Sequence, residues 1–501
     1  MPLTKWQPPA LRHEAAEDGR VTWLELFFDL VYVAALIQLG DRLAGDISWS
    51  GVGAFAGAFV VLWWTWTGTT TFTNRFAVDD ITHRLLTFVQ MFAVGNLAVL
   101  AATTPENWQA WFVGAYVMAR LPLLIMYWRV SRSTPESRPV ATRYIRWFGA
   151  SLVLWVASLA VPEDARFLVW AVALAFEFAA PAITVARPSE APIHDEHIQE
   201  RYALFTIIVL GETFVKTLTE ISDRGISIET QVFGGMSFLM LIAIWWTYFD
   251  DVADAHIRST SALTRSPGRN RLVWVYSHLP LTAAITGFGV AAKKVVSVDS
   301  FGDALKSSYG WLLIGTLIVV LLSVAILDLV TASPHYAVNA PERVGPRVIA
   351  AAVLAVLGIL LVGTEADAVL TVSLITTVVV AQIGVEVMLA HRSEYRINRQ
   401  VRNDIEAVTG SCEHIEAVVP APAAKPAECD ACAAKGVEPV QLRWCLECGH
   451  VGCCDDTTGQ HARQHHLDTG HPTIASLERG ADWAYCYLHD VSSPGFTAHD
   501  S

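Results

Sequence analysis

The sequence predicts an all-α polytopic membrane bundle of about twelve transmembrane helices, followed by a small α+β zinc-binding domain. The first observation is composition: 53% of the 501 residues are hydrophobic and 17% are charged, whereas soluble proteins contain about 25% charged residues. The second is that this deficit comes from long apolar runs within residues 21–390. The third is that all eight cysteines lie between Cys412 and Cys486, in the tail of the chain.

Apolar runs long enough to cross a membrane recur along residues 21–390. A spanning helix needs roughly 20 mostly apolar residues, because the hydrocarbon core is about 30 Å thick. The runs begin near Trp23, Gly51, Leu85, Trp108, Tyr144, Arg166, Tyr202, Gln231, Leu272, Gly310, Val348 and Ala368. Short polar links at 104–106 and 364–367 predict tight antiparallel hairpins. We therefore expect these residues to lie in the lipid bilayer.

Arginines in the short loops predict the orientation of the spans, because cytoplasmic loops carry the excess of Lys and Arg. With the N-terminus inside, the cytoplasmic links carry Arg129, Arg132, Arg138, Arg143, Arg146, Arg258, Arg265, Arg269, Arg271, Arg392, Arg396, Arg399 and Arg402. The opposite loops have few basic residues apart from Lys293, Lys294 and Lys306. This bias predicts a multi-pass protein of the plasma (cell) membrane with both termini in the cytoplasm, where residues 1–20 form an N-terminal segment.

Two carboxylates lie in the first span, WLELFFDLVYVAAL. Glu25 and Asp29 are four residues apart, so both project from one face of a helix. A carboxylate at bilayer depth costs roughly 3 kcal/mol or more unless it is paired, protonated or facing a cavity. Two on one face repel each other unless a cation or a proton lies between them. The structural alternative is that Glu25 lies at the interface while Asp29 bonds to a neighbouring helix.

The seventh span, RYALFTIIVLGETFVK, places Arg201 and Glu212 on one stripe, because eleven residues are close to three helical turns. In the fourth span Arg120 precedes Pro122, and a kink there would direct the arginine toward a carboxylate such as Asp29 or Glu212. The structural alternative for each charged residue is a bond to another helix that serves packing alone.

Two further polar residues complete the intramembrane candidates. The eighth span ends in WWTYFDD, so Asp250 is expected at the cytoplasmic boundary, under an aromatic belt. His278 lies inside the ninth span. Because polar residues within spans usually mark ion or solute pathways, the functional candidates are Glu25, Asp29, Arg120, Arg201, Glu212, Asp250 and His278.

Two segments open alike. HRLLTFVQMF from His83 and ERYALFTIIVLGETF from Glu200 each place an arginine ahead of spaced aromatic residues. One interpretation is an internal duplication of the kind that many transporters contain. The other is that hydrophobic helices resemble one another by composition alone.

Four strings carry a family resemblance over roughly residues 20–390: ELFFDLVYVAAL, ERYALFTIIVLGETF, WWTYFD and YSHLPL. With them the chain resembles the low temperature requirement protein A family of bacterial membrane proteins. The resemblance implies a multi-helix membrane protein whose biochemical activity is not established and which is tied loosely to growth in the cold. The positions that it implies to be important are Glu25, Asp29, Arg201, Glu212, Asp250 and His278.

The sequence changes character after the last span. Residues 391–410 are charged and predict a juxtamembrane helix, and AVVPAPAAKPAE at 417–428 is a semi-rigid Pro/Ala linker. Residues 411–490 carry two CxxC pairs and clustered histidines, which indicate zinc ligation in a reducing compartment. The ligand candidates by spacing are Cys429, Cys432, Cys445, Cys448, His461, His465, His466 and His471. Residues 491–501 form a short tail.

The tail resembles the UBP-type zinc finger, a module of ubiquitin-specific proteases and one histone deacetylase. CDAC, CLECGHVGCC, HARQHH, GHP and WAYCYLH carry the resemblance, from Cys412 to His489. Members hold one to three zincs, and the three-zinc pattern implies three sets of four ligands. These are Cys429, Cys432, Cys453 and His461; Cys445, Cys448, His465 and His471; and Cys412, His414, Cys486 and His489. We expect two to three structural Zn2+ ions, with Cys454 as an alternative to Cys453.

In this family the module captures the free C-terminal carboxylate of ubiquitin with an arginine and aromatic walls. The resemblance therefore implies a peptide-carboxylate pocket lined by Trp483, Tyr485 and Tyr487. Where binding members carry an arginine, this chain has Asp455 and Asp456. Because acidic residues repel a carboxylate, ubiquitin is a doubtful partner, and the module is expected to be a structural domain or a receptor for another ligand. A protein or peptide C-terminus is kept as a candidate partner.

The sequence favours a transporter or channel for a small solute or ion, with the zinc finger as a cytoplasmic regulatory or docking module, because intramembrane charges usually mark a pathway. The first alternative is a membrane-anchored sensor or scaffold that presents the zinc finger. The last is an intramembrane lipid-modifying enzyme, but residues 1–400 contain no HExxH or nucleophile elbow, and no catalytic residue is predicted. With a net charge of −13 and no basic stripe, nucleic acid is not an expected partner.

Overall fold

The structure is a computed structural model that describes residues 9–11, 21–185, 193–250, 256–257, 261, 263, 266–332, 340–362, 364, 366–407, 412–423, 428–434, 439–455, 457, 459–478, 481 and 483–494. The chain divides into two compact units, Met1–His391 and Arg392–Ser501. Each unit is described by itself.

Twelve long helices occupy the twelve places where the sequence predicts spans, within the described residues. They are α1 (Trp23–Gly45), α2 (Trp49–Arg75), α3 (Ile81–Thr103), α4 (Trp108–Ser133), α5 (Arg138–Ala157), α6 (Glu163–Val185), α7 (Asp195–Arg224), α8 (Ile228–Phe249), α9 (Pro267–Val296), α10 (Ser307–Val330), α11 (Ala340–Leu357) and α12 (Ala368–Ala407). Ten of them, all except α5 and α7, are long and apolar enough to cross a membrane. The predicted helical membrane bundle is therefore confirmed.

Short elements connect these helices. The 3₁₀ helices η2 (Pro135–Ser137) and η3 (Ser158–Ala160) flank α5, and a π-helical turn, η4 (Gly358–Val362), follows α11. Two small antiparallel ribbons form from β1 (Ala10–Leu11) with β2 (Phe76–Ala77) and from β3 (His256–Ile257) with β4 (Thr331–Ala332). The ribbon β3–β4 ties the chain after α8 to the chain after α10.

Residues at the start of α1 determine where that helix begins. The Thr22 side chain accepts a hydrogen bond from the Glu25 amide, and the Glu25 carboxylate accepts one from the Thr22 amide at 2.9 Å. This capping box satisfies two backbone donors that a helix N-terminus otherwise leaves unpaired. Glu25 is nevertheless 6% exposed. It therefore combines a capping role with burial.

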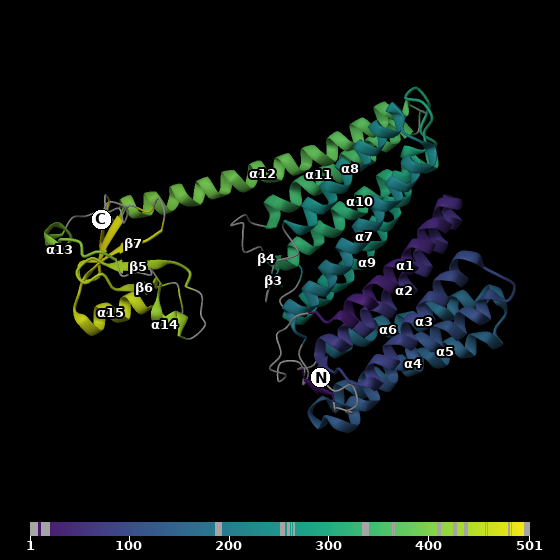
Figure 1. Ribbon diagram of the computed structural model, residues 1–501, viewed down its shortest axis with the longest axis horizontal. Helices are drawn as coiled ribbons and strands as arrows, with labels where there is room; N and C mark the ends of the chain where they lie inside the picture. Colours follow the sequence, from purple (N-terminus) through teal and green to yellow (C-terminus); the bar gives the residue numbers. More distant parts are fainter. Residues whose placement is uncertain are drawn as a thin grey trace. The chain divides into compact units, whose positions relative to one another are not determined.

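The two sets of six helices repeat one packing order. In the first set α1 packs on α2 and α3, α3 on α4, and α4 on α5; in the second, α7 packs on α8 and α9, α9 on α10, and α10 on α11. Figure 1 shows α1–α6 in purple and blue and α7–α11 in teal and green as two groups. The sets meet where α1 packs on α7 and α9, and α2 packs on α7. This order makes α7 the counterpart of α1, not of α3, which contains the similar segment at His83.

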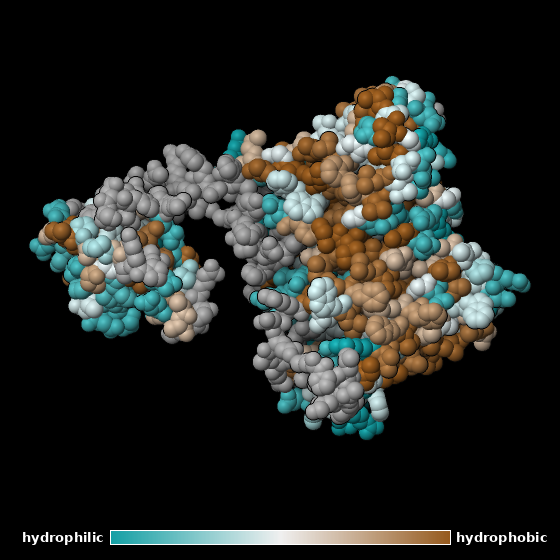
Figure 2. Space-filling model, viewed as in Figure 1, coloured by the Kyte–Doolittle hydropathy of each residue, from teal (hydrophilic) through white to brown (hydrophobic). Residues whose placement is uncertain are grey.

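Large apolar side chains cover the outside of the first unit. Phe92 on α3, Leu168 on α6 and Ile349 on α11 are 68%, 70% and 64% exposed. Figure 2 shows hydrophobic residues spread over the helices on the face in view. An apolar surface of this extent is unfavourable in water and matches the hydrocarbon interior of a bilayer. Together with the ten spans, it makes this unit a multi-pass membrane bundle.

The second unit is a small α+β domain, as predicted. Strands β6 (Val451–Cys453), β5 (Leu442–Cys445), β7 (Thr473–Ser476), β8 (Trp483–Cys486) and β9 (Val491–Pro494) form an antiparallel sheet in that order. Three short helices join it: α13 (Glu413–Ala417), α14 (Asp430–Ala433) and α15 (His461–Thr469). Its buried core consists of Ile415, Trp444, Leu446, Ala475, Ala484 and Cys486. A core this small needs additional cross-links, such as metal ions, to hold a stable fold.

Candidate functional site

The first two predicted intramembrane residues that the structure brings together are Asp29 of α1 and Arg201 of α7. The Arg201 guanidinium donates to both Asp29 oxygens, at 2.6 and 3.2 Å. The indole nitrogen of Trp66 on α2 donates to the same carboxylate at 2.7 Å. Asp29 and Arg201 are 0% and 1% exposed. The pair therefore joins the two six-helix sets in their interior.

Glu25 enlarges this pair into a central ion group, made up of Glu25, Asp29, His197 and Arg201. Glu25 Oε1 lies 3.0 Å from Arg201 Nη1 and 3.6 Å from His197 Nε2. Two carboxylates thus share one guanidinium, so the group carries one negative charge unless a proton resides on His197 or on a carboxyl group. Sequence reasoning did not select His197, which is 1% exposed.

The central ion group repeats one spacing on its two helices. Glu25 and Asp29 are the third and seventh residues of α1, and His197 and Arg201 are the third and seventh residues of α7. Because the helices are counterparts in the packing order, acids on one meet bases on the other at the same depth. This shared spacing is the sequence signal that could have identified His197.

Glu212 does not join Arg201, although both lie on α7. Three helical turns separate the two residues, which is roughly 16 Å along the axis. Glu212 is half-buried and lines a cavity of about 10 Å³ together with Lys216. Lys216 in turn lies 3.3 Å from Asp41 of α1. Asp29, Arg201 and Glu212 therefore do not face a common cavity.

Arg120 pairs with Glu177 of α6, which corrects the expectation that it faces Asp29 or Glu212. The guanidinium donates to Glu177, and the Tyr116 hydroxyl and the Ser151 hydroxyl donate to the same carboxylate at 2.9 and 2.7 Å. A Cβ on Gly68 of α2 would lie 2.5 Å from Arg120 Nη1. Glycine at this position therefore leaves the room that the guanidinium occupies.

A third buried ion group lies in the second helix set. Arg347 of α11 donates to Asp328 of α10 and, at 2.6 Å, to Glu386 of α12. Arg343 lies 3.6 Å from Asp328. Sequence reasoning missed Arg347 as a site residue because it directly precedes the apolar run beginning at Val348. Its 0% exposure shows that the buried part of α11 begins before the apolar run does.

The two remaining candidates lie apart from these ion groups. His278 of α9 is fully buried; its Nε2 is 2.9 Å from the Tyr248 hydroxyl and its Nδ1 is 2.8 Å from the Trp274 carbonyl oxygen. Asp250 is exposed at the C-terminal end of α8, where the sequence predicted an interfacial residue. His278 is thus held between α8 and α9 by polar contacts within the core.

In the second unit, the first cysteine–histidine cluster joins α14, β6 and α15. A tetrahedral zinc with Zn–S of about 2.3 Å and Zn–N of about 2.0–2.1 Å holds sulfur and nitrogen ligands roughly 3.5 Å apart. The sulfurs of Cys429, Cys432 and Cys453 each lie 3.3 Å from His461 Nδ1. Cys454 instead lies 3.6 Å from the Thr457 hydroxyl, outside this cluster. The geometry therefore selects Cys453 over Cys454.

The second cluster joins the end of β5 to α15 and the residues after it. Cys448 Sγ is 3.2 Å from His465 Nε2, and Cys445 Sγ is 3.7 Å from His471 Nδ1. All four ligand atoms lie within 4.8 Å of one another. His466 faces away from them: its Nδ1 lies 2.8 Å from the His471 carbonyl oxygen.

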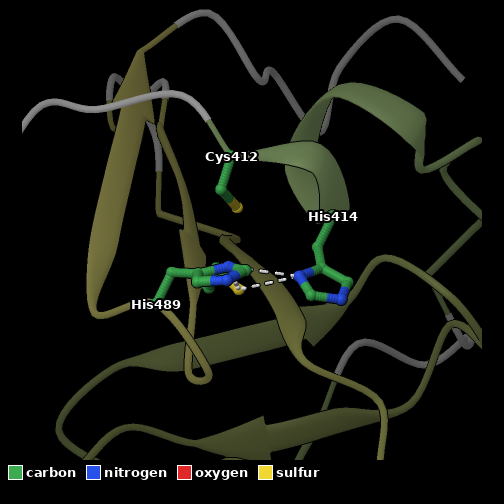
Figure 3. Close-up of side chains that lie close together, drawn as sticks. Cys412, His414 and His489 are labelled. Atoms are coloured by element: carbon green, nitrogen blue, oxygen red, sulfur yellow. Dashed lines mark hydrogen bonds between the residues drawn. The ribbon is translucent and has the colours of Figure 1, made fainter.

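The third cluster unites the two ends of the domain. His414 Nδ1 lies 3.2 Å from His489 Nδ1, and Cys486 Sγ lies 3.9 and 3.8 Å from these two atoms. Figure 3 shows the Cys412 sulfur pointing toward the same space. Sulfur and nitrogen donors within 4.8 Å of one another suit a closed tetrahedral zinc site.

Burial and crowding raise the pKa of two thiols of the clusters. Burial and the neighbouring Cys429 and Cys453 thiols raise the pKa of Cys432 to about 12. Burial raises the pKa of Cys445 to about 11. Packing several thiols together therefore disfavours their thiolate forms, which a divalent cation stabilises in their place. The donor set fits zinc.

The three aromatic residues predicted to line a carboxylate pocket lie on or beside β8. The Arg443 guanidinium covers the Trp483 ring, 4.9 Å from its centroid. Burial, a hydrogen bond to Asp490 and the charges of Asp490 and Asp455 raise the pKa of Tyr485 to about 12. Burial and Asp455 likewise raise the pKa of Tyr487. Arg463 acts in the opposite direction on both pKa values and Arg443 on that of Tyr487, so carboxylates and arginines both lie beside the aromatic residues.

A membrane-spanning helical bundle joined to a cysteine–histidine domain defines the class: a multi-pass membrane protein with a zinc-binding tail. Residues 20–383 match the family model of the bacterial low temperature requirement A protein (LtrA). Residues 429–493 match the Zn-finger in ubiquitin-hydrolases and other proteins. The chain belongs to the LtrA family and carries a UBP-type zinc finger, which confirms both resemblances.

The chain is similar to two proteins whose names state no activity. The uncharacterized protein RA0937 of Rhizobium meliloti (strain 1021) is 31% identical over 291 residues, which cover 55% of this chain and 69% of that protein. The solution NMR structure of protein RPA1320 from Rhodopseudomonas palustris is 34% identical, covers 19% of this chain and 93% of its own, and has a TM-score of 0.17.

Proposed function

We propose that the membrane unit is a transporter or channel for a small solute or ion, and that the zinc finger is a cytoplasmic regulatory or docking module. The central ion group carries this proposal. Buried ion pairs contribute little net stability compared with apolar side chains of similar volume. A stabilising role alone therefore gives little reason to bury two carboxylates, a histidine and an arginine where the helix sets meet.

The net charge of the central ion group suggests that it binds and releases a proton. Two carboxylates and one guanidinium leave a negative charge that a proton on His197, Glu25 or Asp29 would balance. Chains of carboxylates and histidines inside membranes commonly carry protons in pumps and transporters. We therefore propose that protonation of this group is coupled to the movement of the solute or ion.

Proton flux into liposomes that contain the purified protein and a trapped pH dye tests this proposal. A membrane potential imposed with potassium and valinomycin should drive acidification, and Asp29→Asn should slow it roughly tenfold or more, because a proton carrier is removed. Glu163→Gln at the start of α6, a side chain that is 67% exposed, is the matched control and should behave as the wild type. Equal flux in Asp29→Asn and in the wild type would contradict the proposal.

The second candidate function is a membrane-anchored sensor or scaffold. The Arg120–Glu177 group and the group around Arg347 favour it, because in both groups arginines pair with carboxylates inside the bundle. Such pairs can join helices without taking part in transport. In a host whose growth depends on this protein, deletion of residues 412–501 should then abolish that growth, whereas Asp29→Asn should preserve it. The opposite pattern, in which Asp29→Asn is harmful and the deletion is tolerated, would favour the transporter.

Orientation, location and zinc content complete the proposal. We infer that both termini lie in the cytoplasm of a plasma-membrane protein. The arginine-rich links lie on the same side of the bundle as the termini in the predicted span order, and cytoplasmic loops carry the excess of Lys and Arg. We also infer three zincs, one in each cluster of four ligand atoms. A protein or peptide C-terminus is a candidate partner of the finger, with ubiquitin as a doubtful one because Asp455 lies beside Tyr485 and Tyr487.

A further inference from the structure

A cavity lies between the two helix sets, at the end of α2 and near the starts of α5, α7 and α9. Its walls include Trp64, Arg75, Tyr144, Phe148, Arg271 and Tyr276. The volume that the centre of a water molecule can occupy inside it is about 30 Å³. A cavity needs roughly 10–15 Å³ of this volume to hold one water. The cavity therefore has room for more than a single water, and its walls are largely aromatic.

Arg75 gives this cavity a buried cation that has no carboxylate partner among the described residues. It is 3% exposed, and its Nε and Nη1 have no hydrogen-bond acceptor among the described residues. Its guanidinium carbon lies 5.3 Å from the centroid of the Tyr144 ring. By contrast, Arg120, Arg201 and Arg347 each contact a carboxylate. Leaving a buried guanidinium unpaired is costly, so an anion in the cavity would offset that cost.

The cavity wall contains a second charged residue, Arg271, but a carboxylate balances its positive charge. Arg271 donates to both oxygens of Asp195, at 2.6 and 2.8 Å, so that pair has no net charge. Trp64 stacks on Phe178, with ring centroids 3.9 Å apart, which keeps an apolar wall rigid. Within the described part of the chain, the site thus combines one guanidinium that lacks a carboxylate partner with an aromatic surround, a combination suited to a monoanion with an apolar body.

We propose that this cavity binds a small soluble monocarboxylate, with the carboxylate on Arg75 and the apolar part against the aromatic walls. The planar guanidinium presents its N–H donors in the spacing that a carboxylate accepts. Aromatic walls disfavour strongly hydrated ions such as phosphate. The inference deepens the proposed function, on which the role of the ligand as substrate rests; binding itself can be measured without transport.

Binding of isotope-labelled butyrate to the full-length protein in nanodiscs of zwitterionic lipid tests the site. Arg75→Gln should weaken binding roughly tenfold or more, the loss expected for a charge-assisted hydrogen bond. Arg146→Gln, which removes an exposed arginine of the same helix as Tyr144, should bind as the wild type does. Equal binding by Arg75→Gln would overturn the proposal.

Competition on the wild-type protein decides the ligand class even if Arg75→Gln fails to fold. Unlabelled butyrate should displace the label, whereas the neutral butyramide and inorganic phosphate should not. Displacement by either compound would overturn the proposal that the ligand is a soluble carboxylate. Loss of binding in nanodiscs of anionic lipid would overturn it as well, and would assign the site to a lipid headgroup. Butyrate binding without proton flux would contradict the proposed transport function but support the binding site. Proton flux without butyrate binding would support transport and contradict the binding site.

Discussion

Replacing Arg201 with methionine is expected to destabilise the membrane unit severely. The substitution leaves Asp29 and Glu25 buried without the guanidinium that contacts both. Removing one partner of a buried ion pair costs roughly 3–5 kcal/mol, a large share of a total stability of about 5–15 kcal/mol. The unfolding temperature of the purified protein in detergent, read from the loss of monodisperse elution, should fall by roughly 10 °C.

Two further variants separate charge from packing. Arg138→Met removes an exposed arginine at the start of α5 and should leave the unfolding temperature nearly unchanged. Adding Asp29→Asn to Arg201→Met removes one of the two uncompensated charges and should recover part of the loss. If Arg201→Met unfolds at the same temperature as Arg138→Met, the central ion group does not hold the helix sets together.

Replacing Cys429 with serine should remove one zinc and destabilise the C-terminal unit around α14, β6 and α15. A structural zinc supplies about 10–16 kcal/mol of apparent binding free energy in zinc-finger peptides, which the small core around Trp444 cannot replace. Mass spectrometry of the metal content should show a decrease from three zincs per chain to two. Limited proteolysis should then cut residues 412–501 rapidly while the membrane unit stays intact.

Cys454→Ser provides the control for this experiment. Cys454 is buried and adjacent to Cys453, yet its sulfur contacts Thr457 and not the cluster. This variant should therefore retain all three zincs. Loss of zinc from Cys454→Ser with full retention by Cys429→Ser would reverse the ligand assignment, and two zincs in the wild type would remove the cluster containing Cys412 and His414.

The sequence predicts the features of this protein that depend on neighbouring residues. Spans follow from runs of apolar residues, so α1, α4 and α12 begin at the predicted Trp23, Trp108 and Ala368. The zinc ligands follow similarly, because a CxxC pair brings two sulfurs together within a single turn. Even the clusters that join distant segments could be assigned, through the resemblance to a known zinc finger.

The sequence does not predict which charged residues meet, because packing between helices decides it. Arg120 has several carboxylates at similar depth, and only the contact of α4 with α6 selects Glu177. Glu212 shares a helical stripe with Arg201, but three turns place it against a different neighbour. Arg75 ends its apolar run and resembles an ordinary interfacial arginine, so neither composition nor spacing distinguishes it as buried.

The equal positions of acids on α1 and bases on α7 have a consequence for how the two halves can assemble. Two copies of the first half would bring four carboxylates into one contact, and two copies of the second would oppose two arginines and two histidines. Each half thus repels its own kind and attracts the other. Joining both in one polypeptide fixes a one-to-one ratio, and fragments expressed separately should recombine only as unlike pairs.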